Sequence, residues 1–334
     1  MTPTPLELLA RRAARAPEHR PWPRAVVDDA GWHLAARALE RGELVLLGLW
    51  GDEGAVHMAL LDERAREVAV VTRACPEGRF PSVGALHPPA IRLERAVRDL
   101  WGLEPEGTPD PRPWLDHGRW PTRAPLGEPC RQVGEARPSV PGNGYTFLPA
   151  EGDDLHQIPV GPVHAGIIEP GHFRFTQSGE AVVRLEERLG YVHKGVESLL
   201  RGASLERAAP LAGHVSGDST VAYQIAFARA VEAALGWQVP ARAVWLRALM
   251  AELERLANHV GDVGAIFNDA AFTILHANCQ ILREEVLRAS ATCFGHRLMM
   301  DRIVPGGLAC DLPPEGATAV RALLPRVRES FAEV

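Results

Sequence analysis

The chain has 334 residues, of which 46% are hydrophobic and 23% are charged, proportions that are ordinary for a globular protein with room for two domains. A formal charge of −6 and the lack of any Lys/Arg run argue against nucleic acid as a partner. The longest apolar run, Leu44 to Trp50, is far shorter than a membrane-spanning helix, and the N-terminus lacks the apolar core of a signal peptide, so we expect neither segment.

Residues 1–120 predict a small α/β domain. Turn residues separate three short apolar runs, and helical spacing of apolar residues occurs before and after them. Strands are expected at Leu44–Leu49, Ala55–Leu61 and Glu67–Thr72. Helices are expected at Trp32–Leu39 and Ile91–Trp101, and the second should end at Gly102 because glycine readily adopts the left-handed conformation of a helix cap.

A proline-rich linker is predicted at residues 121–155. Nine prolines fall between positions 105 and 141. Proline has no backbone N–H and a fixed φ angle, so this density blocks both helices and sheet ladders. We therefore place the border between two domains here.

Residues 156–334 predict a β-hairpin that leads into a mainly helical domain, so the expected fold class of the whole chain is α+β. The hairpin is expected at His172–Gln177 and Val182–Leu185, around a Ser178-Gly179 turn. Apolar residues then recur at helical spacing. The expected helices are Thr220–Leu235, ended by Gly236; a helix with Pro240 in its first turn and an apolar stripe from Leu246 to Val260; and Ile274–Asp301, followed by Pro305.

The five cysteines do not form a metal-binding pair. They are too far apart in sequence for a CxxC motif, and their odd number suits reduced, buried thiols better than a disulfide framework. They are Cys75, Cys130, Cys279, Cys293 and Cys310.

One group of motifs resembles the C-type (30-kDa) subunit of respiratory complex I. It precedes the linker. The motifs are Phe80-Pro81-Ser82-Val83, Leu93 to Gly102, and Pro109-Asp110-Pro111-Arg112-Pro113.

A second group of motifs, after the linker, resembles the D-type (49-kDa) subunit of complex I and, more closely, the large subunit of group 4 [NiFe] hydrogenases such as formate hydrogenlyase. A C-type unit fused ahead of a D-type unit is itself typical of that hydrogenase branch. The motifs are Gly161-Pro162-Val163-His164, Glu169 to Arg174, Tyr191 to Glu197, Val239 to Arg242 and Glu252 to His259.

The resemblance implies a nickel–iron site whose first pair of cysteine ligands is missing here. Ser216 and Ser219 stand at the two positions, and a serine hydroxyl is a protonated, hard donor that cannot replace a soft thiolate. His214 replaces the arginine usual before the pair, and Tyr223 replaces the histidine usual after it. The chain ends at Val334, ahead of the family's second cysteine pair, which favours a fragment. We therefore expect no [NiFe] site and no metal in this chain.

The resemblance also implies a quinone as a candidate ligand. His164 matches a histidine that lies near the quinone headgroup in the complex I branch, and an imidazole suits that role because it donates a hydrogen bond and titrates near neutral pH. The usual tyrosine partner is absent from residues 211–219, which leaves His214 or Tyr223 to serve the headgroup. The alternative is that His164 only shapes its own loop.

Glu197 matches a hydrogenase glutamate on the proton path near the metal. Burial could raise its pKa enough for proton relay, whereas a first-turn glutamate that favours a helix N-terminus is the plainer reading. The candidate catalytic residues are thus His164, Glu197 and His214.

A polar helix face is expected from Glu252, Arg255 and His259, which are spaced i, i+3 and i+7. It is either a proton-conducting or docking face, or a solvated face with a local ion pair.

Asp218 lies between the two serines and has two interpretations. It could line a polar cavity that holds waters in place of the metals. Alternatively the loop collapses, and Ser219 and Asp218 cap the following helix, which we favour.

The resulting functional hypothesis is a subunit of a membrane-associated, complex I-like or formate-hydrogenlyase-like oxidoreductase. It belongs to the NADH-quinone oxidoreductase or hydrogenase large-subunit type, lacks a working [NiFe] site, and serves electron transfer or ion-translocation coupling; NADH would bind elsewhere in such a complex. The resemblance implies a partner subunit with a 4Fe-4S cluster, membrane antiporter-like subunits, and a peripheral place on the cytoplasmic side of the membrane. The alternatives are a quinone-reducing subunit that uses His164, and a non-enzymatic scaffold or coupling subunit.

Overall fold

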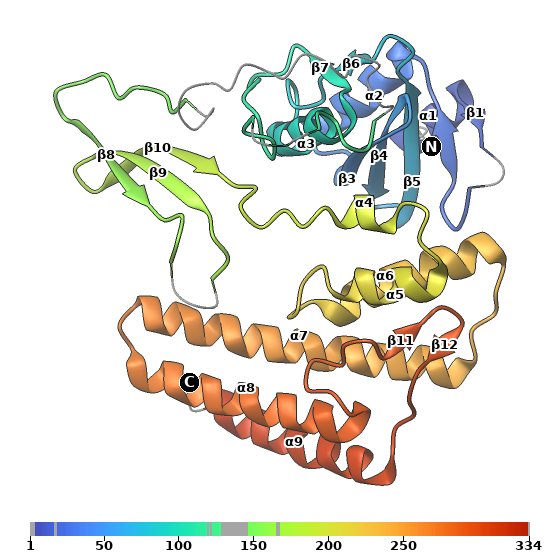
Figure 1. The fold of residues 1–334 in the computed structure, drawn as a ribbon, viewed down its shortest axis with the longest axis vertical. Coiled ribbons are helices and arrows are strands. Elements are labelled where there is room, and N and C mark those ends of the chain that lie inside the picture. Colours follow the sequence, from blue (N-terminus) through green and yellow to red (C-terminus); the bar gives the residue numbers. More distant parts are fainter. Residues whose placement is uncertain are drawn as a thin grey trace. The chain divides into compact units, whose positions relative to one another are not determined.

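A computed structural model divides the chain into two compact units, Met1–Ser198 and Leu199–Val334 (Figure 1). It describes residues 4–16, 19–118, 120, 122–127, 146–164 and 168–332. Most of the predicted linker, including Cys130, lies outside these residues. The mixed α+β class is confirmed, with a sheet-containing first unit and a helical second one.

A five-stranded sheet forms the centre of the first unit. Its order is β1-β2-β5-β4-β3, with β3, β4 and β5 joined as antiparallel neighbours and β2 parallel to β5. Alternate residues of β4, namely Val56, Met58 and Leu60, are fully buried, as expected for one sheet face against a core. The three predicted strands are confirmed. The bounds are β1 Ala14–Arg15, β2 Arg24–Val26, β3 Val45–Asp52, β4 Ala55–Asp62 and β5 Glu67–Ala74.

Helices α2 and α3 cover this core. The α2 helix begins at Asp29, earlier than predicted, because the Asp28 side chain caps it by accepting a hydrogen bond from the Gly31 N–H. The α3 helix has the predicted ends, and Gly102 caps it with a φ of 73°. The bounds are α1 Pro5–Arg12, α2 Asp29–Glu40, the 3-10 turn Pro88–Ala90 and α3 Ile91–Trp101, and a two-stranded sheet pairs β6 Arg79–Pro81 with β7 Glu104–Glu106.

A second sheet of three antiparallel strands also belongs to the first unit. The strands are β8 (Leu155–Val160), β9 (His172–Ser178) and β10 (Ala181–Arg188), in the order β10-β9-β8. The predicted hairpin is confirmed as β9–β10, but β8 was not predicted. Pro159 argues locally against a strand, and it is tolerated here because β8 is an edge strand.

The second unit is a set of packed helices. Two long helices, α7 and α8, form a helical hairpin, α9 packs on α8, and α5 packs on α6 (Figure 1). Their apolar core includes Met250, Val286 and Phe294. The bounds are α5 Leu205–Gly213, α6 Thr220–Leu235, α7 Ala241–Asp269, α8 Thr273–Phe294 and α9 Pro314–Ala332, and the short helix α4, Val196–Leu200, includes the border between the two units.

Two details of the helical prediction are wrong. The α8 helix ends at Phe294 and not at Asp301, because Gly295 adopts a left-handed cap with a φ of 73°. The chain then forms a small hairpin of β11 (Ile303–Val304) and β12 (Gly307–Leu308). Pro240 precedes the first turn of α7 as its N-cap residue.

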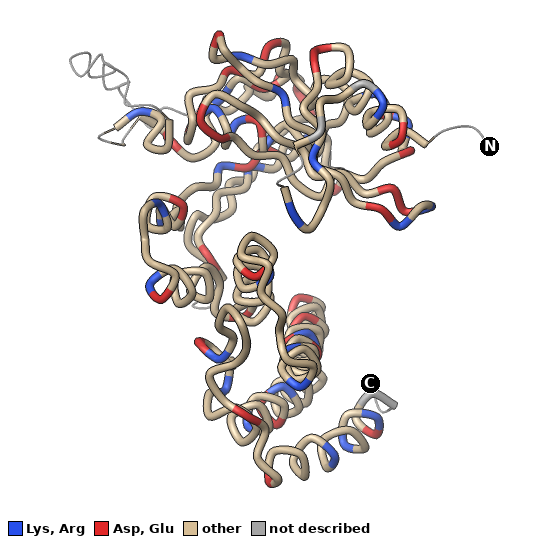
Figure 2. Tube along the Cα trace, turned by 90° about the vertical axis from the view of Figure 1, so that its right-hand side faces the viewer, with Lys and Arg blue, Asp and Glu red and all other residues tan. Residues whose placement is uncertain are grey.

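Charged residues of both signs are interspersed along each unit (Figure 2). Across the described residues, every helix is too short or too polar to cross a membrane.

Candidate functional site

The loop between α5 and α6 contains both serines that stand at the cysteine positions. The Ser216 hydroxyl donates a hydrogen bond to the Asp218 carboxylate. The Asn258 side chain, on α7, donates to the Asp218 carbonyl oxygen at 2.8 Å. The loop is therefore fastened to α7 by the chain's own groups.

Glu254 of α7 caps the N-terminus of α6. Its Oε2 accepts from the Val221 N–H at 2.6 Å and its Oε1 accepts from the Ala222 N–H at 3.0 Å. Burial raises the pKa of Glu254, and these two hydrogen bonds act in the opposite direction. A carboxylate at this position also suits the partial positive charge of a helix N-terminus.

The predicted cap by Ser219 and Asp218 is therefore wrong. Ser219 is the N-cap residue, but its side chain makes no capping hydrogen bond. Its backbone has φ −123° and ψ 25°, away from the extended conformation in which a serine at this position reaches the free N–H groups. Glu254 reaches those groups from the neighbouring helix.

A nickel–iron site does not fit this loop. A cavity lined by Asp218, Glu254 and Asn258 has a volume of about 10 Å³, at the limit for a single water. That size also disfavours the alternative of a water-filled polar cavity. Within the described ranges, no three His, Cys, Asp or Glu side chains are placed to hold a metal ion. The hydroxyls of Ser216 and Ser219 supply no soft donor.

His214 and Tyr223 lie on either side of this loop. His214 caps the C-terminus of α5, and its Nε2 lies 3.4 Å from Asp301 Oδ2, with both side chains about half exposed. Asp301 also lines an apolar hollow of about 410 Å³ with Pro210 and Trp237. Tyr223 lies on α6 with 43% of its surface exposed. His214 and Tyr223 therefore stay candidates, and no contact between them is described.

His164 lies in the first unit, in the loop between β8 and β9. Its Nε2 contacts the Gly171 carbonyl oxygen at 2.8 Å, and its ring lies 6.0 Å from the Phe173 ring. A side chain at Gly161 would collide with both the Gly171 carbonyl and the His164 ring. His164 therefore braces this loop, which agrees with the loop-shaping alternative. His214 and Tyr223 belong to the other unit.

Glu197 and the polar face of α7 are solvent-accessible. Glu197 is exposed in the first turn of the five-residue helix α4. Glu252, Arg255 and His259 are all exposed, and Arg255 forms an ion pair with Glu252. Exposed pairs of this kind contribute little to stability. These positions agree with the solvated alternatives.

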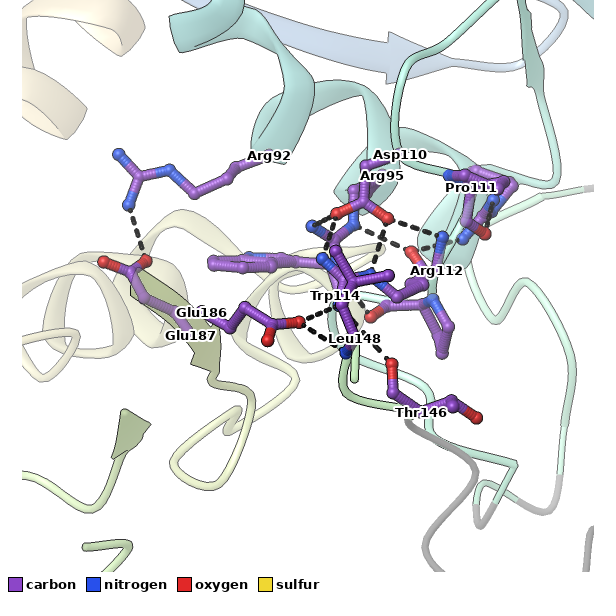
Figure 3. A network of polar contacts seen from close by, with 12 residues as sticks. Arg92, Arg95, Asp110, Pro111, Arg112, Trp114, Thr146, Leu148, Glu186 and Glu187 are labelled. Atoms are coloured by element: carbon purple, nitrogen blue, oxygen red, sulfur yellow. Dashed lines mark hydrogen bonds and ion pairs between the residues drawn. The ribbon is translucent and has the colours of Figure 1, made fainter. Parts of the chain in front are cut away.

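A network that the sequence did not predict joins the β8–β10 sheet to the α/β domain (Figure 3). Arg112 Nη1 donates to Glu186 Oε1 at 2.7 Å, and Asp110 accepts from both Arg112 and Arg95. The Arg95 guanidinium lies over Trp114, with Cζ 4.9 Å from the centroid of the ring. The Pro109–Pro113 motif was the only sign of this network in the sequence. Its arginine, Arg112, binds Glu186 of the β8–β10 sheet.

A buried ion pair in the second unit was also missed. Arg247 donates two hydrogen bonds to Glu232, at 2.7 and 3.0 Å, and it also donates to the carbonyl oxygens of Val304 and Gly307. The pair therefore anchors the β11–β12 hairpin against α6 and α7.

Known proteins are similar both to the α/β domain and to the helical unit that follows it in the sequence. The model of the respiratory-chain NADH dehydrogenase 30 Kd subunit family matches residues 27–135. Hydrogenase-4 component G of Escherichia coli (strain K12) is 31% identical over 286 residues, which cover 84% of this chain and 52% of that protein. Formate hydrogenlyase subunit 5 of the same strain is 30% identical over 287 residues, covering 84% and 50%.

Two further comparisons agree. The C/D-type subunit of NADH-quinone oxidoreductase from Phocaeicola vulgatus (strain ATCC 8482) is 26% identical over 308 residues, covering 85% of this chain and 58% of that protein. A chain of the membrane-bound sulfane sulfur reductase, an archaeal respiratory membrane complex, shares the fold with a TM-score of 0.50 at 21% identity, covering 54% and 48%. The chain is thus similar to group 4 hydrogenase and complex I subunits of combined C and D type. It spans about half the length of the curated relatives that it matches.

Proposed function

We propose that the chain is a subunit of a membrane-associated oxidoreductase assembly of the complex I or formate-hydrogenlyase kind, and that it works there without a [NiFe] site. The relatives' names, which include hydrogenase, formate hydrogenlyase and NADH-quinone oxidoreductase subunits, support the assembly. The closed loop at Ser216–Ser219 supports the missing metal site. The role of the chain in the assembly would be electron transfer or the coupling of redox chemistry to ion translocation.

The capping of α6 by Glu254 is the observation that carries this proposal. A binuclear metal centre needs soft donors and space at the loop, and here two hydroxyls stand at the ligand positions. The two N–H groups at the start of α6 are already bound to the Glu254 carboxylate. These contacts support a loop that the chain's own groups hold without a metal.

By this proposal the partners supply the redox groups. They would be a small subunit with a 4Fe-4S cluster and membrane subunits related to antiporters, and this chain would lie peripherally on the cytoplasmic side. Quinone reduction is the weaker alternative, because His164 Nε2 already contacts the Gly171 carbonyl at 2.8 Å.

Metal analysis of the native assembly tests the proposal. The assembly would be purified from its host membranes through a tag on the full-length protein, and nickel and iron would be measured per chain by mass spectrometry. We expect iron from partner subunits and no stoichiometric nickel. A formate hydrogenlyase purified in parallel is the positive control. Stoichiometric nickel, or hydrogen-dependent dye reduction by the assembly, would refute the proposal.

A further inference from the structure

The buried face of the β9–β10 hairpin carries three nitrogen-bearing side chains in two adjacent rows. Arg188 is the cross-strand neighbour of His172, and Glu186 is the neighbour of Arg174. Residues directly opposite each other in an antiparallel pair share a face, and so do residues two positions apart in one strand. His172, Arg174 and Arg188 therefore project from the same face.

These side chains contain buried polar atoms without partners. His172 and Arg188 are each only 8% exposed. The Nε atoms of Arg174 and Arg188 and the Nε2 atom of His172 are shielded from solvent, and no described residue forms a hydrogen bond with them. Buried polar groups are almost always paired, and a buried guanidinium without a counter-charge is strongly unfavourable.

The nearby carboxylate does not neutralise these cations. Glu186 Oε1 accepts from Arg112 Nη1 at 2.7 Å and from the Leu148 N–H at 3.1 Å. Glu186 Oε2 lies 3.4 Å from Arg184 Nε. The charge of Glu186 is thus shared by Arg112 and Arg184, and among the described residues no carboxylate pairs with Arg174 or Arg188.

Aromatic rings hold the cations in place without offering an acceptor. The Phe147 ring lies 5.1 Å from the His172 ring and 4.0 Å from Arg174 Cζ. The Tyr191 ring lies 5.4 Å from Arg188 Cζ. These contacts favour the guanidinium groups in fixed positions, so the face is organised before any ligand arrives.

We propose that His172, Arg174 and Arg188 form a binding site for an oxyanion of the carboxylate or phosphate type. Such a group offers acceptors and a negative charge, and neither is within hydrogen-bond distance of the Nε atoms of Arg174 and Arg188 among the described residues. His172 Nδ1 contacts the Gly161 carbonyl at 3.2 Å. Because that carbonyl can only accept, Nδ1 donates in this contact, and Nε2 is the ring nitrogen that remains to face a ligand.

The oxyanion can come from two sources with the same chemistry. One is a free ion from solution, and the other is an acidic group that a partner subunit presents on assembly. The site itself does not depend on the proposed function, because it is defined by the side chains of the first unit alone.

Thermal unfolding of the isolated chain tests the site. The melting temperature would be compared in sodium phosphate and in sodium chloride of equal ionic strength, for the native chain, Arg188→Gln and the control Arg92→Gln. Arg92 pairs with Glu187 on the same hairpin but is exposed. Phosphate should raise the melting temperature of the native chain and of Arg92→Gln, and leave that of Arg188→Gln unchanged. By calorimetry, Arg188→Gln should bind phosphate at least about tenfold more weakly, since it loses a charged bidentate donor.

A second readout separates ligand binding from a structural role. Without phosphate, Arg188→Gln should melt no lower than the native chain, because the substitution removes an uncompensated buried charge. Arg174→Gln should weaken phosphate binding in the same way. Equal phosphate effects on the native chain and Arg188→Gln, or no phosphate effect on the native chain, would overturn the proposal.

Repeating the phosphate titration on the purified assembly identifies the source of the oxyanion. Phosphate binding that persists there identifies a free ion as the ligand. Binding that is present in the isolated chain and lost in the assembly identifies an acidic group of a partner subunit.

Discussion

The loop before α6 and the buried face of the β9–β10 hairpin differ in whether their polar groups have hydrogen-bond partners. In the loop, Glu254 and Asn258 bind the free backbone groups, so the region is satisfied within the chain. On the hairpin, buried nitrogen atoms of His172 and Arg188 find no acceptor among the described residues.

The two regions thus differ in whether the described residues supply partners for the buried polar groups. The loop that contains Ser216 and Ser219 is closed by local contacts. An unsatisfied requirement for negative charge lies instead in the first unit, away from that loop in sequence. Removing a paired buried charge should therefore lower the free energy of unfolding, whereas removing an unpaired one on the hairpin should not.

The largest effect is expected at Arg247, whose buried charge is paired. Arg247→Leu leaves the Glu232 carboxylate, 6% exposed, without its counter-charge. The free energy of unfolding should fall by about 3 to 5 kcal/mol, measured by chemical denaturation. The double variant Arg247→Leu/Glu232→Leu should recover part of this loss. If Arg247→Leu lowered the free energy of unfolding no more than Arg188→Gln does, the expected difference between paired and unpaired arginines would be wrong.

The next effect concerns the cap of α6. Glu254→Ala removes the acceptor for two N–H groups and should cost about 2 kcal/mol of unfolding free energy. Ser219→Ala is the matched control and should cost less than about 0.5 kcal/mol, because the Ser219 side chain makes no capping hydrogen bond. Denaturation curves showing the larger loss for Ser219→Ala would contradict the assigned cap.

A buried histidine of the first unit should give a pH-dependent effect. Burial lowers the pKa of His57 from 6.5 to about 4, and its Nδ1 contacts Thr72 Oγ1 at 2.8 Å. The folded-state pKa is depressed, so this stabilisation is present above pH 6.5 and is lost as the pH falls toward 4. The two pKa values differ by about 2.5 pH units, so the free energy of unfolding should fall by about 3 kcal/mol between these limits. Melting curves of His57→Asn should show a correspondingly weaker pH dependence, and an unchanged one would argue against this origin.

The smallest effect is expected from restoring the cysteine pair. Ser216→Cys/Ser219→Cys should change the unfolding free energy by less than about 0.5 kcal/mol, since neither hydroxyl caps the helix. The variant chain should still bind no stoichiometric nickel after incubation with the metal, because the loop remains fastened to α7. Tight nickel binding would show that the missing thiolates alone, and not the closed loop, prevent metal binding.

Local patterns predicted the elements well where a single residue sets the boundary. The ends of α3 and α6 were predicted correctly because Gly102 and Gly236 both adopt left-handed caps. The end of α8 was missed because residues 296–301 continue a helix-compatible sequence beyond Gly295, and the glycine signal was underweighted.

The site could be predicted only in part. The absence of thiolates at Ser216 and Ser219 follows from the sequence, but the group that closes the loop does not. Glu254 acts on a backbone N–H that is 33 positions away, and Arg112 reaches a carboxylate 74 positions away. No local periodicity reports such contacts, since they depend on how the helices and sheets pack.

The contacts between Arg112 and Glu186 and between Arg92 and Glu187 join residues before position 128 to residues after position 145. Peptide continuity is therefore not what keeps the β8–β10 sheet with the α/β domain. A gene split within residues 128–145, or a protease cut there, should yield two polypeptides that stay associated. The fused chain and a two-chain version of it would then be interchangeable arrangements of one molecule.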